Sequence, residues 1–207
     1  TKMMVVVDGD VDLNDSAAVA KYVSQHYDPQ QDTYFTAGPV DVLDHSCSVM
    51  AFGGKMGIDA TKKTAEELAM RSAPAQEMSP NEINIAALKT AFPEIRQVND
   101  SLFRNGISML FIAVEKNRKG HIRELAGKLA ALPGLSAAKV ILFLEHTVDV
   151  ADIGDAVWRF ANNVDPKRDA IITDTDETGG LSRLFMDGTR KTEALDGFKR
   201  DWPNILA

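Results

Sequence analysis

The chain has 207 residues, of which 44% are apolar and 26% charged. This composition is ordinary for a globular protein and excludes a disordered tail or a disulfide miniprotein. The formal net charge of −7 argues against a general phosphate-binding surface, so we expect no nucleic-acid partner. Cys47 is the single cysteine, which excludes an intrachain disulfide and a structural zinc set and fits a reducing compartment.

No apolar run approaches the roughly 20 residues that span a bilayer, and the first ten residues lack the pattern of a secretory signal. We therefore expect a cytoplasmic protein without a transmembrane segment. An apolar strand candidate, residues 3–7, follows Thr1 and Lys2 directly. This abrupt start suggests a fragment of a longer protein.

Along the chain, the strand at residues 3–7 is followed by an acidic turn and a helix that Asp15 can cap. Asp28-Pro29 ends that helix, and Tyr34 begins a returning strand. Later the pattern predicts a strand at residues 107–114 and a helix at residues 121–132.

The sequence then repeats itself. Residues 139–145 (Lys-Val-Ile-Leu-Phe-Leu-Glu) resemble residues 2–8 (Lys-Met-Met-Val-Val-Val-Asp) at an offset of 137, which continues without a gap through the Asp-Pro turn. Residues 189–192 (Thr-Arg-Lys-Thr) resemble residues 61–64 (Thr-Lys-Lys-Thr) at an offset of 128, so the second copy lacks nine residues in between. Such self-similarity indicates two copies of one unit.

Each copy reads as strand, helix and strand within about 35 residues, a length that favours a parallel crossover. We therefore predict an α/β fold of two related lobes, each with a small, mostly parallel sheet flanked by helices. The predicted domains are a first copy at residues 1–64, a helical connector at 65–104 and a diverged second copy at 105–207. The strand and helix at residues 107–132 belong to the second copy, and their equivalents in the first copy would precede Thr1.

The acidic turn after the first strand contains Asp8, Asp10 and Asp12. Their alternate spacing suggests a calcium loop, but Leu13 and Val19 stand where such a loop needs Gly and Glu. Asp8 and Asp10 also resemble the nucleophile motif of magnesium-dependent haloacid-dehalogenase-like phosphatases. The remaining alternative is a polar turn whose carboxylates favour the following helix terminus.

Two further segments carry reactive side chains. Asp44-His45-Ser46-Cys47 has the residue types of a hydrolase triad, but adjacent residues do not normally fill all three roles, which favours a polar loop. Lys55, within the glycine-rich residues 53–57, could help backbone amides approach an anion. The segment lacks the Walker pattern, so we expect no nucleotide loop.

Taken together, these blocks resemble a known family. Residues 2–12, Asp28-Pro29-Gln30-Gln31-Asp32, Gly38-Pro39, Leu43-Asp44-His45-Ser46 and residues 53–63 (Gly-Gly-Lys-Met-Gly-Ile-Asp-Ala-Thr-Lys-Lys) are similar, in order and spacing, to the C-terminal domain of UbiD-like carboxy-lyases. Residues 105–207 resemble a second, diverged copy of that domain, as in members assigned to menaquinone biosynthesis. Within this resemblance the candidate functional residues are Asp8, Asp10, Asp44, His45, Lys55 and Asp59.

The resemblance implies a non-oxidative decarboxylase of aromatic or conjugated carboxylic acids, in menaquinone or ubiquinone biosynthesis. Its cofactor would be prenylated FMN, held with a divalent metal and potassium. The family's catalytic Arg and Glu pair and its metal ligands lie in an upstream flavin-binding barrel domain, and no segment here matches them. We therefore assign no catalytic or metal-binding residue to this chain and expect it to be inactive alone.

The resemblance also implies that this region packs against the barrel, contributes to a homodimer or higher oligomer and closes the active-site cleft. Lys2 matches a family lysine that would reach the flavin phosphate, which makes it the one cofactor-binding candidate. Lys139 is its counterpart, but the acidic turn after it is degraded, so the second copy is expected to serve packing, oligomerisation or regulation. The alternatives left open are the phosphatase and a non-catalytic interaction module.

Overall fold

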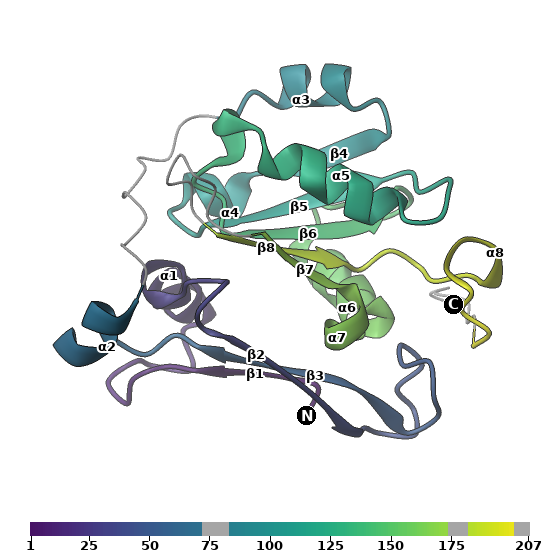
Figure 1. Ribbon diagram of the computed structural model, residues 1–207. Helices are drawn as coiled ribbons and strands as arrows, with labels where there is room; N and C mark the ends of the chain where they lie inside the picture. Colours follow the sequence, from purple (N-terminus) through teal and green to yellow (C-terminus); the bar gives the residue numbers. More distant parts are fainter. Residues whose placement is uncertain (72–82, 174–181, 201–207) are drawn as a thin grey trace.

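The computed structural model describes residues 1–71, 83–173 and 182–200, which form two β-sheets with helices between them and above the second sheet (Figure 1). The strands are β1 (Met3–Val6), β2 (Thr33–Pro39), β3 (Phe52–Asp59), β4 (Ile95–Asn99), β5 (Met109–Val114), β6 (Val140–Glu145), β7 (Ala170–Thr173) and β8 (Arg183–Asp187). The helices are α1 (Ser16–His26), α2 (Ala65–Met70), α3 (Ile85–Ala91), α4 (Ser101–Arg104), α5 (His121–Ala130), α6 (Ile153–Asn163), α7 (Pro166–Asp169) and α8 (Glu193–Asp196), with a 3-10 turn at Pro133–Leu135. Among the helices so described, none has the length and apolar character needed to cross a membrane.

Both sheets are mixed. In the first sheet the strand order is β1-β3-β2, with β1 parallel and β2 antiparallel to β3. The second sheet has the order β4-β5-β6-β8-β7, with β5, β6 and β8 parallel and an antiparallel strand at each edge.

The order β6-β8-β7 repeats the order β1-β3-β2 with the same directions. The registers also correspond, because Met3 lies opposite Met56 and Val140 opposite Leu184, at the offsets of 137 and 128 found in the sequence. In both copies the lysine that precedes the first strand accepts a backbone hydrogen bond, from Met56 to Lys2 (3.0 Å) and from Leu184 to Lys139 (2.8 Å). The α/β fold of two related lobes is thus confirmed.

Two details of the predicted architecture need correction. The crossover from β1 through α1 to β2 does not make parallel neighbours, because β3 lies between the two strands and β2 runs antiparallel to it. The sheets are therefore mixed rather than mostly parallel. In the segment expected to be a helical connector, residues 95–99 form β4, which pairs with β5 at the edge of the second sheet.

Aspartate side chains cap the starts of α1 and α6. The side chain of Asp15 accepts a hydrogen bond from the Ala18 amide (2.9 Å) at the start of α1, and that of Asp152 accepts one from the Asp155 amide (3.1 Å) at the start of α6. These are equivalent positions in the two copies, so one N-cap is used twice.

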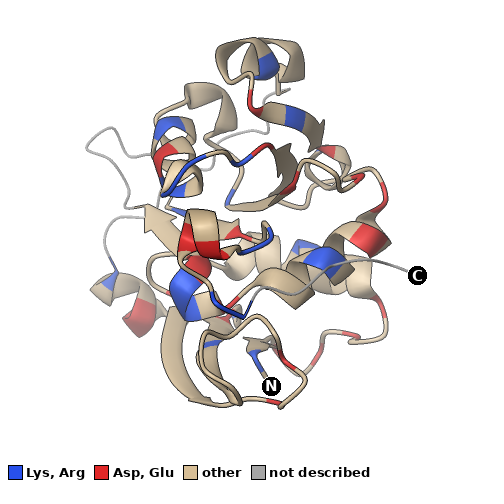
Figure 2. Ribbon diagram, turned by 90° about the vertical axis from the view of Figure 1, so that its right-hand side faces the viewer, with Lys and Arg blue, Asp and Glu red and all other residues tan. Residues whose placement is uncertain are grey.

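The main hydrophobic cores lie on the two faces of the second sheet. Between the sheets, Tyr27 and Met56 of the first copy pack in one cluster with Leu144 and Phe160 of the second. On the other face, residues of α3 and α5 cover β5, β6 and β8. Charged residues lie largely in the helices and loops around these cores, with basic and acidic positions interspersed (Figure 2). Because one core contains residues of both copies, neither copy is packed without the other.

Candidate functional site

A cavity of about 300 Å³ lies where the loop between β2 and β3 meets α6. It is lined by Lys2, Asp41, Leu43, Asp44, His45, Ala161 and Asn162. Three of the predicted residues, Lys2, Asp44 and His45, thus come together, although Asp44 lies 42 positions after Lys2 in the sequence. We treat this cavity as the candidate site and refer to it as the Lys2 pocket.

Lys2 has its polar partners within the chain. Its ammonium group donates to the Ser46 hydroxyl (3.0 Å) and the Ala161 carbonyl (2.8 Å), and it forms an ion pair with Asp44 (3.2 Å). An ammonium group has three N–H donors, so these three partners saturate it.

Two successive aspartate turns shape the loop that carries Asp44. The carboxylate of Asp41 accepts from the Leu43 amide (2.8 Å), and that of Asp44 accepts from the Ser46 amide (2.9 Å) and hydroxyl (2.5 Å). Burial raises the pKa of Asp44, but the Ser46 hydrogen bonds and the charge of Lys2 outweigh this effect. The pKa therefore lies below its ordinary value, and the carboxylate is held ionised.

Residues of the second copy fix the other side of this loop. Arg168 donates to the Ser46 carbonyl (2.7 Å), and Arg200 donates to the Cys47 carbonyl (2.9 Å). Cys47 is buried, and its thiol contacts the Asp44 carbonyl (3.2 Å). The Lys2 pocket is therefore built by both copies.

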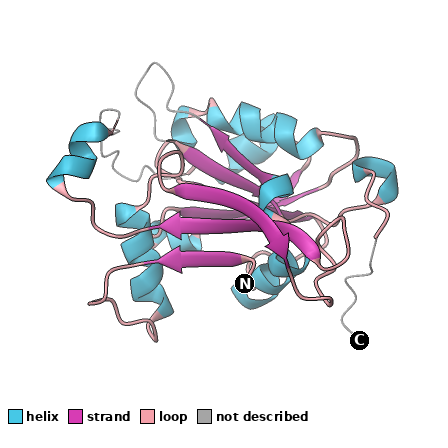
Figure 3. Ribbon diagram, turned by 60° about the horizontal axis from the view of Figure 1, so that its bottom comes forward, coloured by secondary structure: helices cyan, strands magenta, loops and turns pink. Residues whose placement is uncertain are grey.

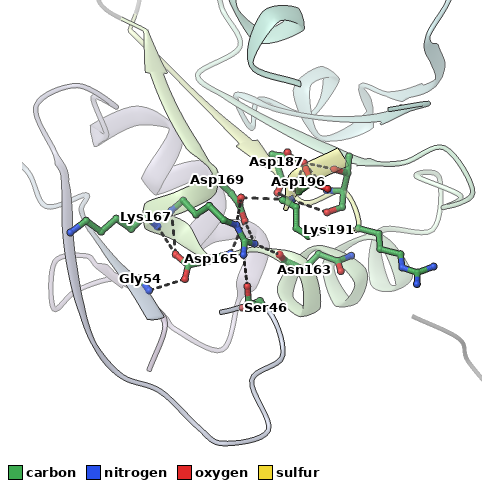
Figure 4. Close-up of polar contacts among 12 residues, drawn as sticks. Ser46, Gly54, Asn163, Asp165, Lys167, Asp169, Asp187, Lys191 and Asp196 are labelled. Carbon is green, nitrogen blue, oxygen red and sulfur yellow. Dashed lines mark hydrogen bonds and ion pairs between the residues drawn. The ribbon is translucent and has the colours of Figure 1, made fainter. Parts of the chain in front are cut away.

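Arg168, which contacts Ser46 of the pocket loop, also belongs to a cluster of charges. Asp169, Asp187 and Lys191 of this cluster are labelled in Figure 4. The guanidinium of Arg168 forms a bidentate pair with the carboxylate of Asp169, with both contacts at 2.7 Å. Lys191 lies 3.7 Å from Asp169 and 3.1 Å from Asp187. Burial raises the pKa of Asp169, whereas the charges of Lys191 and Lys116 overcome burial at Asp187 and lower its pKa.

This cluster is not among the predicted sites, although the sequence holds a signal for it. Asp169 is the counterpart of Asp32, and Asp187, Thr189 and Lys191 are the counterparts of Asp59, Thr61 and Lys63. The first copy forms the matching contacts, since Lys63 lies 3.5 Å from Asp32 and 2.9 Å from Asp59. Two aspartates and a lysine are retained at equivalent positions in both copies. This pattern predicts that each copy contains the same ion cluster.

Asp8 and Asp10, two of the other predicted residues, lie in the turn beyond the carboxyl end of β1. Asp8 accepts hydrogen bonds from the Tyr22 hydroxyl and from the Lys62 amide (2.8 Å), and these bonds lower its pKa. Asp10 is exposed and lies 3.6 Å from the Lys62 ammonium. The contacts of these carboxylates stabilise the turn after β1. Asp8 does not reach the Lys2 pocket, because the four residues of β1 alone separate Asp8 from Lys2 by roughly 13 Å.

Asp59 and Lys55 both lie on β3. The Asp59 carboxylate accepts from the Thr61 hydroxyl (2.6 Å), and with the charge of Lys63 this contact outweighs burial and lowers the pKa to about 2. Lys55 lies opposite Thr36 of β2, and its side chain passes 3.5 Å from where a Cβ of Gly38 would be. Neither residue reaches the Lys2 pocket. Among the described residues no group of three His, Cys, Asp or Glu side chains is placed to hold a metal ion.

Comparison with known proteins bears on both copies. The model of the 3-octaprenyl-4-hydroxybenzoate carboxy-lyase C-terminal domain matches residues 1–60 and 78–182. An uncharacterised protein of Helicobacter pylori strain 26695 is 29% identical over 195 residues, which are 92% of this chain and 28% of that protein. One from Archaeoglobus fulgidus is 44% identical over 68 residues, or 32% of this chain and 14% of that protein. The chain thus spans under a third of the length of these relatives.

The chain is also similar to solved structures of decarboxylases. The open form of the vanillic acid decarboxylase of Sedimentibacter hydroxybenzoicus is 21% identical, with a TM-score of 0.45, over 54% of this chain and 28% of that chain. The 3,4-dihydroxybenzoic acid decarboxylase of Enterobacter cloacae is 15% identical, with a TM-score of 0.44, over 76% and 36%. The family model alone covers well over half of this chain, and the chain therefore belongs to the UbiD-type carboxy-lyase family, as its C-terminal domain region.

Proposed function

We propose that this chain is the C-terminal part of a non-oxidative decarboxylase that acts on an aromatic or conjugated carboxylic acid in menaquinone or ubiquinone biosynthesis. In this proposal the chain closes the active-site cleft and contributes to a homodimer, while an upstream barrel domain carries out the chemistry. The observation that carries the proposal is the family match, which extends over both copies. The assembly of Leu43, Asp44 and His45 with Lys2 around one pocket supports it.

Prenylated FMN, when bound to such an enzyme, would accept the electrons released as carbon dioxide leaves. The described residues do not fit its phosphate at Lys2 as they stand, because Ser46, Ala161 and Asp44 use all three donors of the ammonium group. We therefore assign the flavin, the divalent metal and potassium to the upstream domain. A contact between Lys2 and the phosphate stays a prediction that requires Asp44 to release the lysine.

Two variants of the complete protein test that contact. If Lys2 binds the phosphate, Lys2→Ala weakens flavin binding in a fluorescence titration, whereas Asp44→Ala, which frees the lysine, leaves it equal or stronger. If Lys2 serves only the loop, both variants lower stability and neither changes flavin affinity.

The decarboxylase proposal itself is tested by carbon dioxide release from 4-hydroxybenzoate and related aromatic acids. We expect release from the complete protein loaded with prenylated FMN and none from the 207-residue chain alone. A loaded complete protein that decarboxylates none of these acids would contradict the proposal. Magnesium-dependent hydrolysis of 4-nitrophenyl phosphate by the chain, lost in Asp8→Asn, would instead establish the phosphatase alternative.

A further inference from the structure

Another cavity, of about 380 Å³, lies at the start of α5, in the second copy. It is lined by residues within 116–123, 168–171 and 187–197, and none of them lines the Lys2 pocket. We call it the α5 cavity. Its volume falls within the range of roughly 300–1,000 Å³ that is usual for small-molecule sites.

The α5 cavity lies at the carboxyl ends of two strands that run in the same direction. The loop that follows β5 lines it, and so does Asp187, the last residue of β8. Both strands pair in parallel with β6. Figure 1 and Figure 3 both show α8 beyond these strand ends, on the side of the C-terminus. Open α/β sheets bind their ligands outside the carboxyl ends of strands, so the cavity has the position that this fold favours for a ligand.

The lining of the α5 cavity is positive, in a chain whose net charge is −7. Five cationic side chains and three carboxylates line it. Each carboxylate is paired with a cation, in the pairs Lys116–Asp196 (2.8 Å), Arg168–Asp169 (2.7 Å) and Lys191–Asp187 (3.1 Å). The other two cations, Lys119 and Arg123, are exposed and have no ion-pair partner among the described residues. The cavity therefore contains two positive charges that the described part of the chain does not balance.

The cations of the lining already stabilise an anion. Burial raises the pKa of Asp187, but the charges of Lys191 and Lys116 outweigh this effect, and the pKa lies below its ordinary value. Burial prevails at Asp169, which is 4% exposed. An anion at the exposed mouth of the cavity loses less hydration than these aspartates do, so the same charges favour it more.

The start of α5 supplies neutral donors to the same cavity. Gly120 is the N-cap residue, and no side chain caps the helix. Gly120, Ile122 and Arg123 all line the cavity, which places the first backbone amides of α5 at its wall. The positive end of the helix dipole adds to the cationic side chains there.

We propose that the α5 cavity binds a small phosphate monoester. Lys119 and Arg123 pair with the phosphate at the start of α5, where the amides of the helix supply further donors. The organic part of the ester lies against Ile171 and Leu195, which are apolar residues of the lining. A doubly charged phosphate balances the two unpaired cations, whereas a singly charged carboxylate would balance one.

Calorimetric titration of the complete protein with phenyl phosphate tests the two cations. We expect saturable binding that Lys119→Gln and Arg123→Gln each weaken at least about threefold, because each removes one exposed charge from the phosphate. Both side chains are exposed, so neither substitution should change the unfolding midpoint. Absence of saturable binding, or binding that neither substitution weakens, would overturn the proposal.

Lys128→Gln is the matched control for these variants. It removes the same charge from α5, but Lys128 pairs with Glu124 (2.6 Å) and does not line the cavity. We expect this variant to bind phenyl phosphate with the native affinity. Equal weakening in all three variants would show diffuse attraction to α5 and would overturn the proposal.

Hydrogen exchange of peptides from the complete protein locates the bound ester. We expect exchange in residues 115–124 to slow at least about threefold when phenyl phosphate is bound, and exchange at the start of α6, which Asp152 caps, to stay unchanged. Protection that excludes residues 115–124 would place the ester elsewhere and overturn the proposal.

Inorganic phosphate tests the organic part of the ligand. It can pair with Lys119 and Arg123 but leaves Ile171 and Leu195 uncovered, so we expect it to bind at least about threefold more weakly than phenyl phosphate. Equal affinities would overturn the assignment of the cavity to an ester.

Discussion

Lys2 and Lys139 each donate a hydrogen bond to a backbone carbonyl of the other copy. The ammonium group of Lys2 donates to the Ala161 carbonyl, and that of Lys139 donates to the Ser24 carbonyl (2.8 and 2.7 Å). These pairs are equivalent, because Lys139 and Ala161 lie 137 positions after Lys2 and Ser24. Such reciprocal contacts define an approximate twofold axis, so the copies pack like the subunits of a symmetric dimer within one chain.

A second reciprocal pair supports the same axis. The Gly54 amide donates to Asp165 (2.9 Å), and the Ser182 hydroxyl donates to Asp28 (2.8 Å). Asp165 and Ser182 are the counterparts of Asp28 and Gly54 at offsets of 137 and 128. The contacts between the copies thus follow from the duplication itself, and they can be probed one at a time.

Replacement of Lys139 by Met is expected to lower the free energy of unfolding by about 1.5–3 kcal/mol, the range for hydrogen bonds that involve a charged group. The ammonium group also donates to the Tyr27 carbonyl (3.0 Å), so its loss leaves two carbonyls near the interface without this donor. Urea unfolding measures the change.

Lys62→Met is the matched control, because Lys62 forms an exposed ion pair with Asp10 that should contribute well under about 1 kcal/mol. Equal effects of the two substitutions would contradict a role for Lys139 in joining the copies.

Gly54→Ala should destabilise the protein strongly. A Cβ at this position would lie 2.2 Å from an Asp165 carboxylate oxygen and 2.7 Å from the backbone nitrogen of Lys167, which cannot swing away. We expect a loss of about 3 kcal/mol or more, from overpacking and the weakened bond to Asp165.

Gly57, three residues along the same strand, has nothing within 4 Å of the position that a Cβ would take. Gly57→Ala should therefore leave the denaturation midpoint almost unchanged. A comparable loss in both variants would show that β3 tolerates no added side chain for reasons other than the contact with α7.

The doubled unit, the α/β class and the helix caps could be predicted because they depend on local patterns, such as Asp15 and Asp152 at matching distances from their strands. The strand order could not, since nothing in the sequence of β1, α1 and β2 indicates that β3 inserts between the two strands. The contact between Lys2 and Asp44 could not be predicted either. The resemblance marked both residues, but their contact depends on a loop held by Arg168 and Arg200 of the second copy.

The free energy of unfolding at acidic pH should depend on Asp59. Its pKa is lowered to about 2 from an ordinary value of 3.8, so the ionised carboxylate stabilises the folded state above the unfolded pKa. This contribution is lost as the pH falls from about 4 towards 2, and we expect it to be about 1 kcal/mol because the side chain is partly exposed.

Asp59→Asn removes the charge at every pH. The difference in free energy of unfolding between the native protein and this variant should be largest above about pH 5 and should shrink below pH 4. Urea titrations across this range measure it, and a difference that does not vary with pH would contradict the assignment.

The shared core predicts that both copies unfold in one transition. Cys47, buried in the first copy, reports on that copy through thiol labelling, and Trp158 of α6 reports on the second through fluorescence in a Trp202→Phe background. Because Met56 and Phe160 lie in the same cluster, exposure of one copy strips the packing from the other. We expect the two probes to give the same urea midpoint, and Gly54→Ala to move both together. Two separate midpoints would show that the copies are independent domains, and the reciprocal contacts of Lys2 and Lys139 would then join units that are each stable alone.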